Sequence, residues 1–340
     1  MSMTVLSRPW ARTAAVLLAG ALLLTACQAD QENGQETDDV GDNAEASETG
    51  GDYPVTVDTV YGEITLEEKP ERIVSVTGPY AEMLVALGEQ PVAFAGSPRA
   101  GDDYLAGHPW MEDTDVDVSV HDTDLIAEGY TPSMETVASY EPDLIIGQGA
   151  DWGIDEEMFE QLSEIAPVYT TPYEYDQWDK TLSDLAKLTG TAEAGMEAIA
   201  EVEASFDEAR ERIEHLQGAS YIYGDLVEQD IRLTGHFYLL EQLGLATDED
   251  LAALESISLE ALDQITTDIF YVMTWRSEDA VETLESDPRW GELPAVQNDA
   301  VIYADAALTN ATELGPIAIP WALDQITAEL EDATVDQAEQ

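Results

Sequence analysis

One long helical pattern, from about residue 191 to residue 218, constrains the fold more than any other feature of the sequence. Apolar residues recur there at gaps of three and four positions, which is the period of an α-helix with one buried stripe. These residues are Met196, Ile199, Val202, Phe206, Ala209, Ile213 and Leu216. Gly190 is expected to end the preceding helical segment, Thr191 to cap the N-terminus of the long helix, and Gly218 to end it. Because strand and helix patterns alternate on both sides, we interpret the stretch as a rod joining two lobes; the alternative is a surface helix within one domain.

The start of the chain predicts export and lipidation. A basic segment precedes an apolar run over 14–24 that is too short to span a bilayer comfortably, and the run ends in Leu24-Thr25-Ala26-Cys27. This tetrapeptide resembles the bacterial lipobox, in which the cysteine is lipidated and becomes the mature N-terminus. We therefore expect a lipoprotein signal peptide over 1–26 and a lipid anchor at Cys27, the only cysteine, on the extracytoplasmic face of the cell membrane. A plain cleaved signal is the alternative.

Residues 28–52 predict a disordered acidic tether. They are mostly Asp, Glu, Gly, Ser and amides, with no aromatic residue, and such a segment cannot bury enough apolar surface to fold. As a flexible chain its reach is about 25–30 Å. No later segment is apolar enough over a sufficient length to predict a membrane span.

The charge of the chain excludes one class of function. The sequence has 72 acidic and 12 basic residues, and two of the basic residues lie in the signal peptide, so 10 remain and the formal charge of the mature chain is −62. Nucleic-acid binding through a general basic surface is excluded. Because self-repulsion at this density opposes folding at low ionic strength, we interpret the source as halophilic or halotolerant. An acidic exported protein from an ordinary habitat is the alternative.

Residues 53–190 predict an N-terminal lobe. After a small hairpin, short buried strands alternate with helices, which is typical of a parallel α/β sheet; the strands are expected at 73–76, 91–95, 144–146 and 167–169. Ligands of such sheets bind beyond the carboxyl ends of the strands. Tyr80, Arg99 and Trp152 follow these strands and are therefore candidate ligand contacts. The glycines around Trp152 lack the spacing of a dinucleotide motif.

Residues 218–330 predict a C-terminal lobe of the same kind, and 331–340 predict a tail. A strand is expected at 220–223, a loop with Arg232 at 224–233, and further strands at 267–272 and 301–303. Trp275 and Arg276 follow the strand at 267–272, at the position equivalent to the loop of Trp152. These three residues complete the set of candidate ligand contacts.

A short repeat relates the two lobes. Ser133, Glu135 and Asp143 recur at identical spacing in the second lobe; their counterparts are Ser258, Glu260 and Asp268. An apolar strand ends each unit. The repeat favours lobes of related construction.

Several motifs together resemble the substrate-binding lipoproteins of bacterial iron–siderophore ABC importers, whose two lobes are bridged by one long helix. The resemblance spans about 53–330, and its motifs lie at 69–74, 82–88 (EMLVALG), 141–146, 165–168, 258–260, 268–270, 290–296 and 301–303. It implies an α/β fold of two Rossmann-like lobes with central parallel sheets, joined by a linker helix over 191–217. It also implies a monomeric, non-catalytic receptor, without a cofactor, that delivers a ferric siderophore to ABC permease subunits with their cytoplasmic ATPase.

The resemblance also implies how the receptor docks. In similar proteins one exposed glutamate per lobe pairs with arginines of the permease, and Glu135 and Glu260 match those positions. The alternative is that both are solvated carboxylates at helix starts, where the helix dipole favours them.

A ferric siderophore is bulky and often anionic, so its site needs cations and aromatic faces. Arginine offers a fixed fork of donors to carboxylate, catecholate or hydroxamate oxygens, and Arg99, Arg232 and Arg276 are expected in loops at the cleft. The aromatic candidates for stacking and cation–π contact are Tyr80, Trp152 and Trp275. Each arginine has a local salt bridge as its alternative. No direct metal ligand is expected.

Other ligands and activities stay open. Haem would need a Tyr, His or Met ligand, which His236 offers, and cobalamin shares the architecture. Direct zinc or manganese binding is disfavoured because the four histidines are scattered in the sequence. A lipid-anchored enzyme is disfavoured because no nucleophile or metalloprotease motif is present. The sequence does not separate catecholate, hydroxamate and mixed siderophores.

We expect the melting temperature to rise from low salt to about 1 M NaCl, because the screening length falls to about 3 Å at that concentration. Melts followed by circular dichroism at increasing NaCl measure this change, with sucrose as an uncharged control solute. A melting temperature that is highest at low salt contradicts the halophilic interpretation.

Overall fold

A computed structural model of the chain describes residues 53–76, 79–96, 103–127, 131–149, 153–172, 175–276, 279–313 and 315–335. The predicted signal peptide, the lipidation site at Cys27 and the tether lie outside these ranges. Within the ranges, no helix is both long enough and apolar enough to cross a membrane.

A four-stranded parallel sheet in the order β4-β3-β5-β6 forms the centre of the N-terminal lobe. Its strands are β3 (Ile73–Ser75), β4 (Ala93–Phe94), β5 (Leu144–Gln148) and β6 (Val168–Thr171). The helices are α1 (Tyr80–Ala86), α2 (Tyr104–Gly107), α3 (Met134–Ser139), α4 (Glu156–Ser163) and α5 (Trp178–Thr189), with 3-10 turns η1 (Pro109–Met111), η2 (Val118–Val120), η3 (Thr123–Leu125) and η5 (Tyr175–Gln177). A hairpin of β1 (Val55–Thr59) and β2 (Gly62–Leu66) packs on α5 through β1. The predicted hairpin and strands are confirmed, and the apolar runs of β3 and β5 are buried on both faces, as parallel strands require.

The C-terminal lobe has a mixed sheet in the order β10-β8-β7-β11-β12, with β9 paired to the start of β7. Its parallel strands are β7 (Ser220–Val227), β9 (Ala246–Thr247), β11 (Ile269–Met273) and β12 (Val301–Ala304). β8 (Asp230–Leu233) runs antiparallel to both of its neighbours, β7 and β10 (Ser256–Ser258). The helices are α7 (Tyr238–Gln242), α8 (Glu249–Ala252), α9 (Ala280–Glu285), α10 (Pro294–Gln297), α11 (Ala306–Ala311) and α12 (Ala318–Leu330), with 3-10 segments η7 (Leu259–Gln264) and η8 (Trp290–Glu292). Two α/β lobes with parallel strands confirm the predicted fold class.

The predicted loop over 224–233 is wrong, because β7 continues through it and returns as β8. In β8 the buried residues Ile231 and Leu233 alternate with the exposed residues Asp230 and Arg232, which is the pattern of a half-buried strand. Glu228 takes a φ of 57° in the turn. Arg232 therefore lies on a strand and not in a loop.

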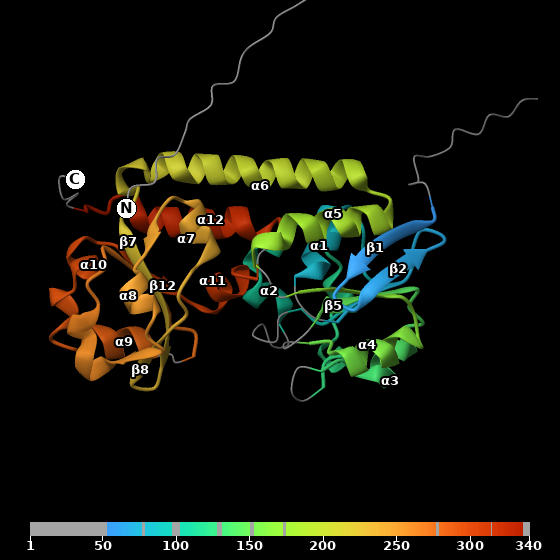
Figure 1. The fold of residues 1–340 in the computed structure, drawn as a ribbon, viewed down its shortest axis with the longest axis horizontal. Helices are drawn as coiled ribbons and strands as arrows, with labels where there is room; N and C mark the ends of the chain where they lie inside the picture. Colours follow the sequence, from blue (N-terminus) through green and yellow to red (C-terminus); the bar gives the residue numbers. More distant parts are fainter. Residues whose placement is uncertain are drawn as a thin grey trace, which may run out of the picture. The chain divides into compact units, whose positions relative to one another are not determined.

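The long helix is α6 (Ala192–Arg212), followed by η6 (Glu214–Leu216). It packs against α5 of the N-terminal lobe and α12 of the C-terminal lobe, so it joins the lobes as predicted (Figure 1). Three details differ from the prediction, and the first is that the α-helix ends at Arg212 and not near residue 217. The Thr191 side chain makes no capping hydrogen bond, and Met196 is 67% exposed.

The buried face of α6 begins with small residues in place of Met196. Gly195 and Ala198 are buried there, and a Cβ on Gly195 would lie only 2.7 Å from the Cβ of Ala186 in α5. The two helices therefore approach so closely that only small side chains fit between them. Further along, Val202 and Phe206 are buried as predicted.

The two aspartates of the sequence repeat make equivalent contacts. Asp143 lies just before β5 and accepts hydrogen bonds from the backbone N–H groups of Glu71 and Arg72, just before β3, at 2.7 and 2.8 Å. Asp268 lies just before β11 and accepts from the backbone N–H and the hydroxyl of Ser220 in β7, both at 2.8 Å. Each aspartate thus joins the start of its own strand to the start of the parallel neighbour. The related construction predicted for the lobes is seen at this point.

The side chains of Ser133 and Ser258 are also equivalent. Each accepts a hydrogen bond from a backbone N–H of the helical turn that follows, that of Thr136 for Ser133 and that of Glu260 for Ser258. The N-cap predicted at Ser133 is confirmed. Both turns then present an exposed glutamate in their first residues, Glu135 or Glu260.

We expect Asp143→Ala and Asp268→Ala each to lower the free energy of unfolding by about 1–3 kcal/mol, because each removes hydrogen bonds to a strand start. Urea unfolding measures the change, and Asp113→Ala, at an exposed position, is the matched control. Equal stability of all three variants would show that the two aspartates do not stabilise their sheets.

Candidate functional site

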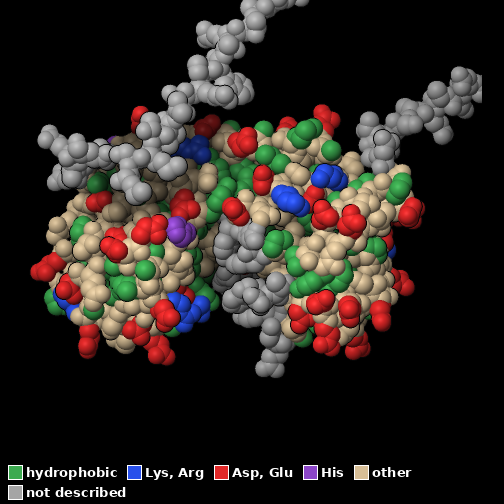
Figure 2. All heavy atoms as spheres, viewed as in Figure 1, with side chains coloured by type: hydrophobic (Ala, Val, Ile, Leu, Met, Phe, Trp, Pro, Cys, Tyr) green, Lys and Arg blue, Asp and Glu red, His purple; other side chains and the backbone are tan. Residues whose placement is uncertain are grey.

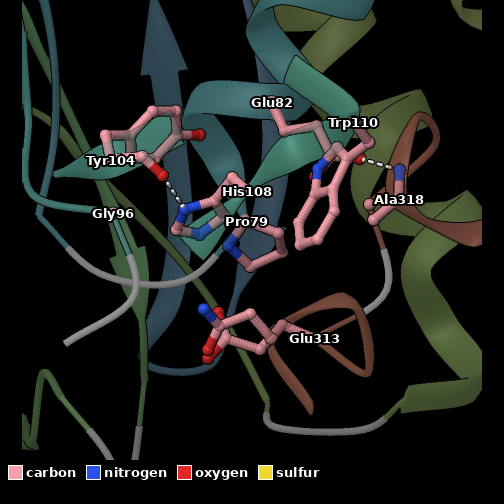
Figure 3. Close-up of a pocket in the computed structure, with 10 residues that line it drawn as sticks. Pro79, Glu82, Gly96, Tyr104, His108, Trp110, Glu313 and Ala318 are labelled. Carbon is pink, nitrogen blue, oxygen red and sulfur yellow. Dashed lines mark hydrogen bonds between the residues drawn. The ribbon is translucent and has the colours of Figure 1, made fainter. Parts of the chain in front are cut away.

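A cavity lies between the lobes and is lined by both. The N-terminal lobe contributes Glu82 of α1, Tyr104 of α2, His108 and Trp110 (Figure 3). The C-terminal lobe contributes Asn310 of α11, Glu313 after α11, and Ala318 at the start of α12. The free volume is only about 10 Å³, which is about the room that one water molecule needs.

Glu82 is one of two carboxyl groups that line this cavity. Its side chain accepts hydrogen bonds from the backbone N–H groups of Ile317 and Ala318, both at 2.7 Å, and from the indole Nε1 of Trp110 at 2.9 Å. The first two donors belong to the start of α12, so a carboxyl group of one lobe caps a helix of the other. Burial raises the pKa of Glu82 to about 7 against the opposing effect of these three hydrogen bonds.

Two further contacts join the lobes around this cavity. The side-chain amide of Asn310 donates to the carbonyl of Gly107 at 2.9 Å, and the rings of Trp110 and Trp321 lie 5.2 Å apart. Near α6, the indole of Trp178 donates to the hydroxyl of Tyr238 at 3.2 Å. The lobes therefore share polar and aromatic contacts as well as a hydrophobic core that continues through both.

A second group of candidate residues lies at the carboxyl ends of β7 and β11 in the C-terminal lobe. Arg276 Nε donates to Asp225 Oδ2 at 2.6 Å, and the guanidinium lies 4.3 Å from the ring centroid of Trp275. Arg232 is opposite Asp225 in the antiparallel register of β7 and β8, so both side chains leave the same face of the sheet. The structure thus brings three predicted contacts, Arg232, Trp275 and Arg276, around one aspartate.

The geometry of this group suits anion recognition. Asp225 is 3% exposed and fixes Arg276 by Nε, while Trp275 supports one face of the guanidinium. Among the described residues, neither terminal nitrogen of Arg276 has a hydrogen-bond partner, and the other carboxylate oxygen of Asp225 is buried without one. An arginine held by Nε presents its two terminal nitrogens as a fork for a planar pair of oxygens.

Four other described arginines have structural contacts. Arg72 donates to the carbonyl groups of Tyr140 and Glu141, and Arg210 to that of Gln242. Two more form ion pairs; they are Arg212, with Asp324 and Glu331, and Arg289, with Asp287. Arg232 differs, because no ion pair involves it within the described part of the chain.

The remaining predicted contacts are placed as follows. Arg99 and Trp152 lie outside the described residues. Tyr80 is the first residue of α1, is 2% exposed, and its hydroxyl is hydrogen-bonded to that of Thr171. Burial raises the pKa of Tyr80. Its side chain is part of the core in this conformation and presents no face to the space between the lobes.

The two predicted docking glutamates are exposed, one on each lobe. Glu135 is in the first turn of α3, and Glu260 is in the first turn of η7. Arg289 donates to the backbone carbonyl of Glu260, which fixes this turn and leaves the carboxylate exposed. On the face seen in Figure 2, acidic side chains predominate over the few basic ones.

The imidazole ring of His236 lies against two carboxylates. Its Nδ1 lies 2.5 Å from Glu241 Oε1, and its Nε2 lies 3.9 Å from Glu249 Oε2. The hydrogen bond to Glu241 raises the pKa of His236, so the ring is held as a partner of these side chains. In the described ranges, no group of three or more His, Cys, Asp and Glu is arranged to hold a metal ion.

Glu82 and Asp225 are the site residues that the sequence did not indicate. Glu82 was present in the EMLVALG motif, where an acidic residue among apolar ones signals a buried polar group. Asp225 interrupts an apolar run from Tyr221 to Val227 in the same way. In both cases the signal was a lone carboxylate inside a buried element.

Comparisons with known proteins give the family and the fold of the chain. A family model described as a periplasmic binding protein matches residues 73–308, more than half of the chain. The Fe(3+)-citrate-binding protein YfmC of Bacillus subtilis is 25% identical over 299 residues, which cover 85% of this chain and 87% of the relative. The Fe(3+) dicitrate-binding periplasmic protein FecB of Escherichia coli is 27% identical over 265 residues, which cover 75% and 83%.

A solved structure shares the fold. It is the crystal structure of PiaA from Streptococcus pneumoniae in complex with ferrichrome, with a TM-score of 0.62 and 23% identity over 82% of this chain and 99% of that chain. At this identity the likeness concerns the arrangement of the elements. The joining of two lobes by α6 is therefore a property of a known fold.

Proposed function

Because the chain belongs to the periplasmic binding protein family, we propose that it is a lipid-anchored, non-catalytic receptor that captures a ferric siderophore between its lobes for an ABC importer. The two relatives described above are named for binding ferric citrate, and both match most of this chain. The proposal therefore takes iron chelates as its ligand class. The chelator class, whether carboxylate, catecholate or hydroxamate, is left to experiment.

The observation that carries the proposal is the Arg276 group. Ferric siderophores present paired oxygens and often a negative charge, which a guanidinium fork matches. In a mature chain with a formal charge of −62, an anionic chelate would be repelled by most of the surface, so the site needs a local positive charge. Arg276 on Trp275 and Arg232 on β8 supply two cations against the one carboxylate of Asp225, together with an aromatic face. Arg99 and Trp152 remain proposed contacts by their sequence positions.

We expect one ferric chelate to quench tryptophan fluorescence saturably, and Arg276→Ala to weaken its affinity about tenfold or more, because a charge-assisted pair of hydrogen bonds is lost. The panel is ferric citrate, a ferric catecholate, a ferric trihydroxamate, haemin and cobalamin in about 1 M salt. Arg276→Lys keeps a charge beside Asp225 but loses the fork, and we expect it to weaken binding too.

The matched control is Arg212→Ala, which removes an arginine paired with Asp324 and Glu331. Unchanged affinity in that variant shows that loss of positive charge alone is not the cause. If haemin or cobalamin is the one compound of the panel that binds, the proposed ligand class, a ferric siderophore, is wrong. Equal affinity of the Arg276 and Arg212 variants would show that Arg276 is not part of the binding site.

We further propose that Glu135 and Glu260 dock the receptor on the permease, with Cys27 as the lipid anchor. Both glutamates are exposed, lie at equivalent positions of the two lobes, and start turns capped by equivalent serines. A monomer that presents one carboxylate per lobe matches a permease with two subunits, driven by its cytoplasmic ATPase. The tether 28–52 gives the body reach above the membrane.

We expect Glu135→Gln combined with Glu260→Gln to reduce chelate uptake by cells about tenfold or more while the affinity of the purified protein stays unchanged, because the lost charges face the permease and not the ligand. Labelled-iron uptake and fluorescence titration measure the two quantities. The control pair is Glu156→Gln with Glu282→Gln, exposed carboxylates in the first turns of α4 and α9. Weakened binding by the purified docking variant would refute the assignment.

A further inference from the structure

Glu82 is a buried carboxyl group that the proposed ligand contacts do not use. It is 3% exposed and lies on α1 of the N-terminal lobe, 235 residues before its partner Ile317 in the chain. Its three hydrogen-bond donors are backbone or indole N–H groups, and no lysine or arginine pairs with it in the described ranges. A buried carboxyl without a cation is costly to ionise.

The C-terminal lobe is shaped around this carboxyl group. A Cβ on Gly315 would lie 2.1 Å from Glu82 Oε1 and 2.2 Å from Cδ, so any side chain at position 315 would displace the carboxyl. Gly315 has no positive φ that would explain a glycine there. The glycine therefore provides the room in which a side chain of one lobe reaches the first turn of α12 in the other.

The charged and titratable groups around Glu82 come from every element packed on it. Besides Trp110 and the N–H groups of α12, they are Tyr104 of α2, His108 between α2 and η1, and Glu313 after α11. The charge of Glu313 opposes ionisation of Glu82. Burial raises the pKa of Tyr104, and the charges of Glu82 and Glu313 raise it further. Two carboxyl groups from different lobes thus line one small cavity (Figure 3).

A protonated Glu82 satisfies all these contacts. Its carbonyl oxygen can accept from Ile317 and Ala318, as Oε1 does. Its hydroxyl oxygen can accept from Trp110 and donate into the cavity, which has room for one water molecule. Protonation therefore removes the buried charge without breaking a hydrogen bond.

We propose that Glu82 is a proton-dependent latch between the lobes, which holds the first turn of α12 on the N-terminal lobe when protonated and loosens when the proton is lost. The latch is a property of the contact itself. Its consequence, a cleft whose preorganisation for the chelate depends on pH, rests on the proposed function.

The direction in which pH changes the stability of the closed contact follows from the linkage between proton binding and closure. In the closed contact burial raises the pKa of Glu82 to about 7, and separation of α12 from the group would return the pKa toward its ordinary value of 4.5. The closed contact therefore binds the proton more tightly than the open one. Its stability is greatest below about pH 4.5 and falls as the pH rises through about 7.

Amide hydrogen exchange of the purified protein without ligand tests the latch. For peptides that cover residues 315–322, we expect the protection, corrected for the intrinsic pH dependence of exchange, to fall about tenfold from pH 5.5 to pH 8.5. Glu82→Gln carries no titratable group, so protection should no longer depend on pH. Glu89→Gln, a carboxylate just after α1 that pairs with Lys69, should keep the pH dependence of the parent.

Gly315→Ala is the second variant and keeps Glu82 in the chain. We expect it to displace the carboxyl group, lower the protection of the same peptides and remove the pH dependence. In a Glu82→Ala background, where the room is free, the same glycine substitution should have little further effect. Protection that is independent of pH in the parent, or equally dependent on pH in Glu82→Gln, overturns the latch. Because no chelate is present, neither outcome depends on whether the protein binds a siderophore.

Discussion

The packing of one helix on two lobes is the constraint on which the rest of the structure depends. Helix α6 lies against α5 and α12, and at Gly195 it approaches α5 so closely that no side chain fits. The core that begins there continues through both lobes. We expect a helix shared in this way to limit the separation of the lobes and to favour a receptor that moves little on binding.

The acidic charge of the chain is the second constraint, because it leaves few arginines that could bind an anionic ligand. The chain has 72 acidic residues, and its basic residues are mostly tied to backbone carbonyls or to carboxylates on the surface. Arg276 also forms a local salt bridge, which was the alternative considered for each arginine, but its partner is a buried aspartate. Asp225 holds it by one nitrogen and Trp275 by one face, which leaves the fork toward solvent. One buried aspartate thus orients a scarce cation as a hydrogen-bond donor, and this is the physical basis of the proposal that the protein binds an anionic chelate.

Much of the fold could be predicted because its signals are local. Residues close together in the sequence show the period of α6, the short apolar strands and the glycines that end helices. The family motifs gave the order of these elements. Three features escaped for physical reasons. The β7–β8 hairpin looked like a loop because Asp225 and Glu228 interrupt its apolar pattern. Met196 looked buried because the small residues Gly195 and Ala198 carry little hydrophobic signal. Glu82 acquires its role from Gly315 and α12, which no local pattern near residue 82 can reveal.

The central claim, an iron chelate held between the lobes beside the Arg276 group, is tested most directly by locating the iron. Crystals grown with the ferric chelate that the protein binds, measured at the iron absorption edge, give its position independently of the protein phases. The account predicts one strong anomalous peak between the lobes, next to the guanidinium of Arg276 and the ring of Trp275. A peak on an outer surface, or a chelate held entirely by other residues of the cleft with Arg276 turned away, would contradict it.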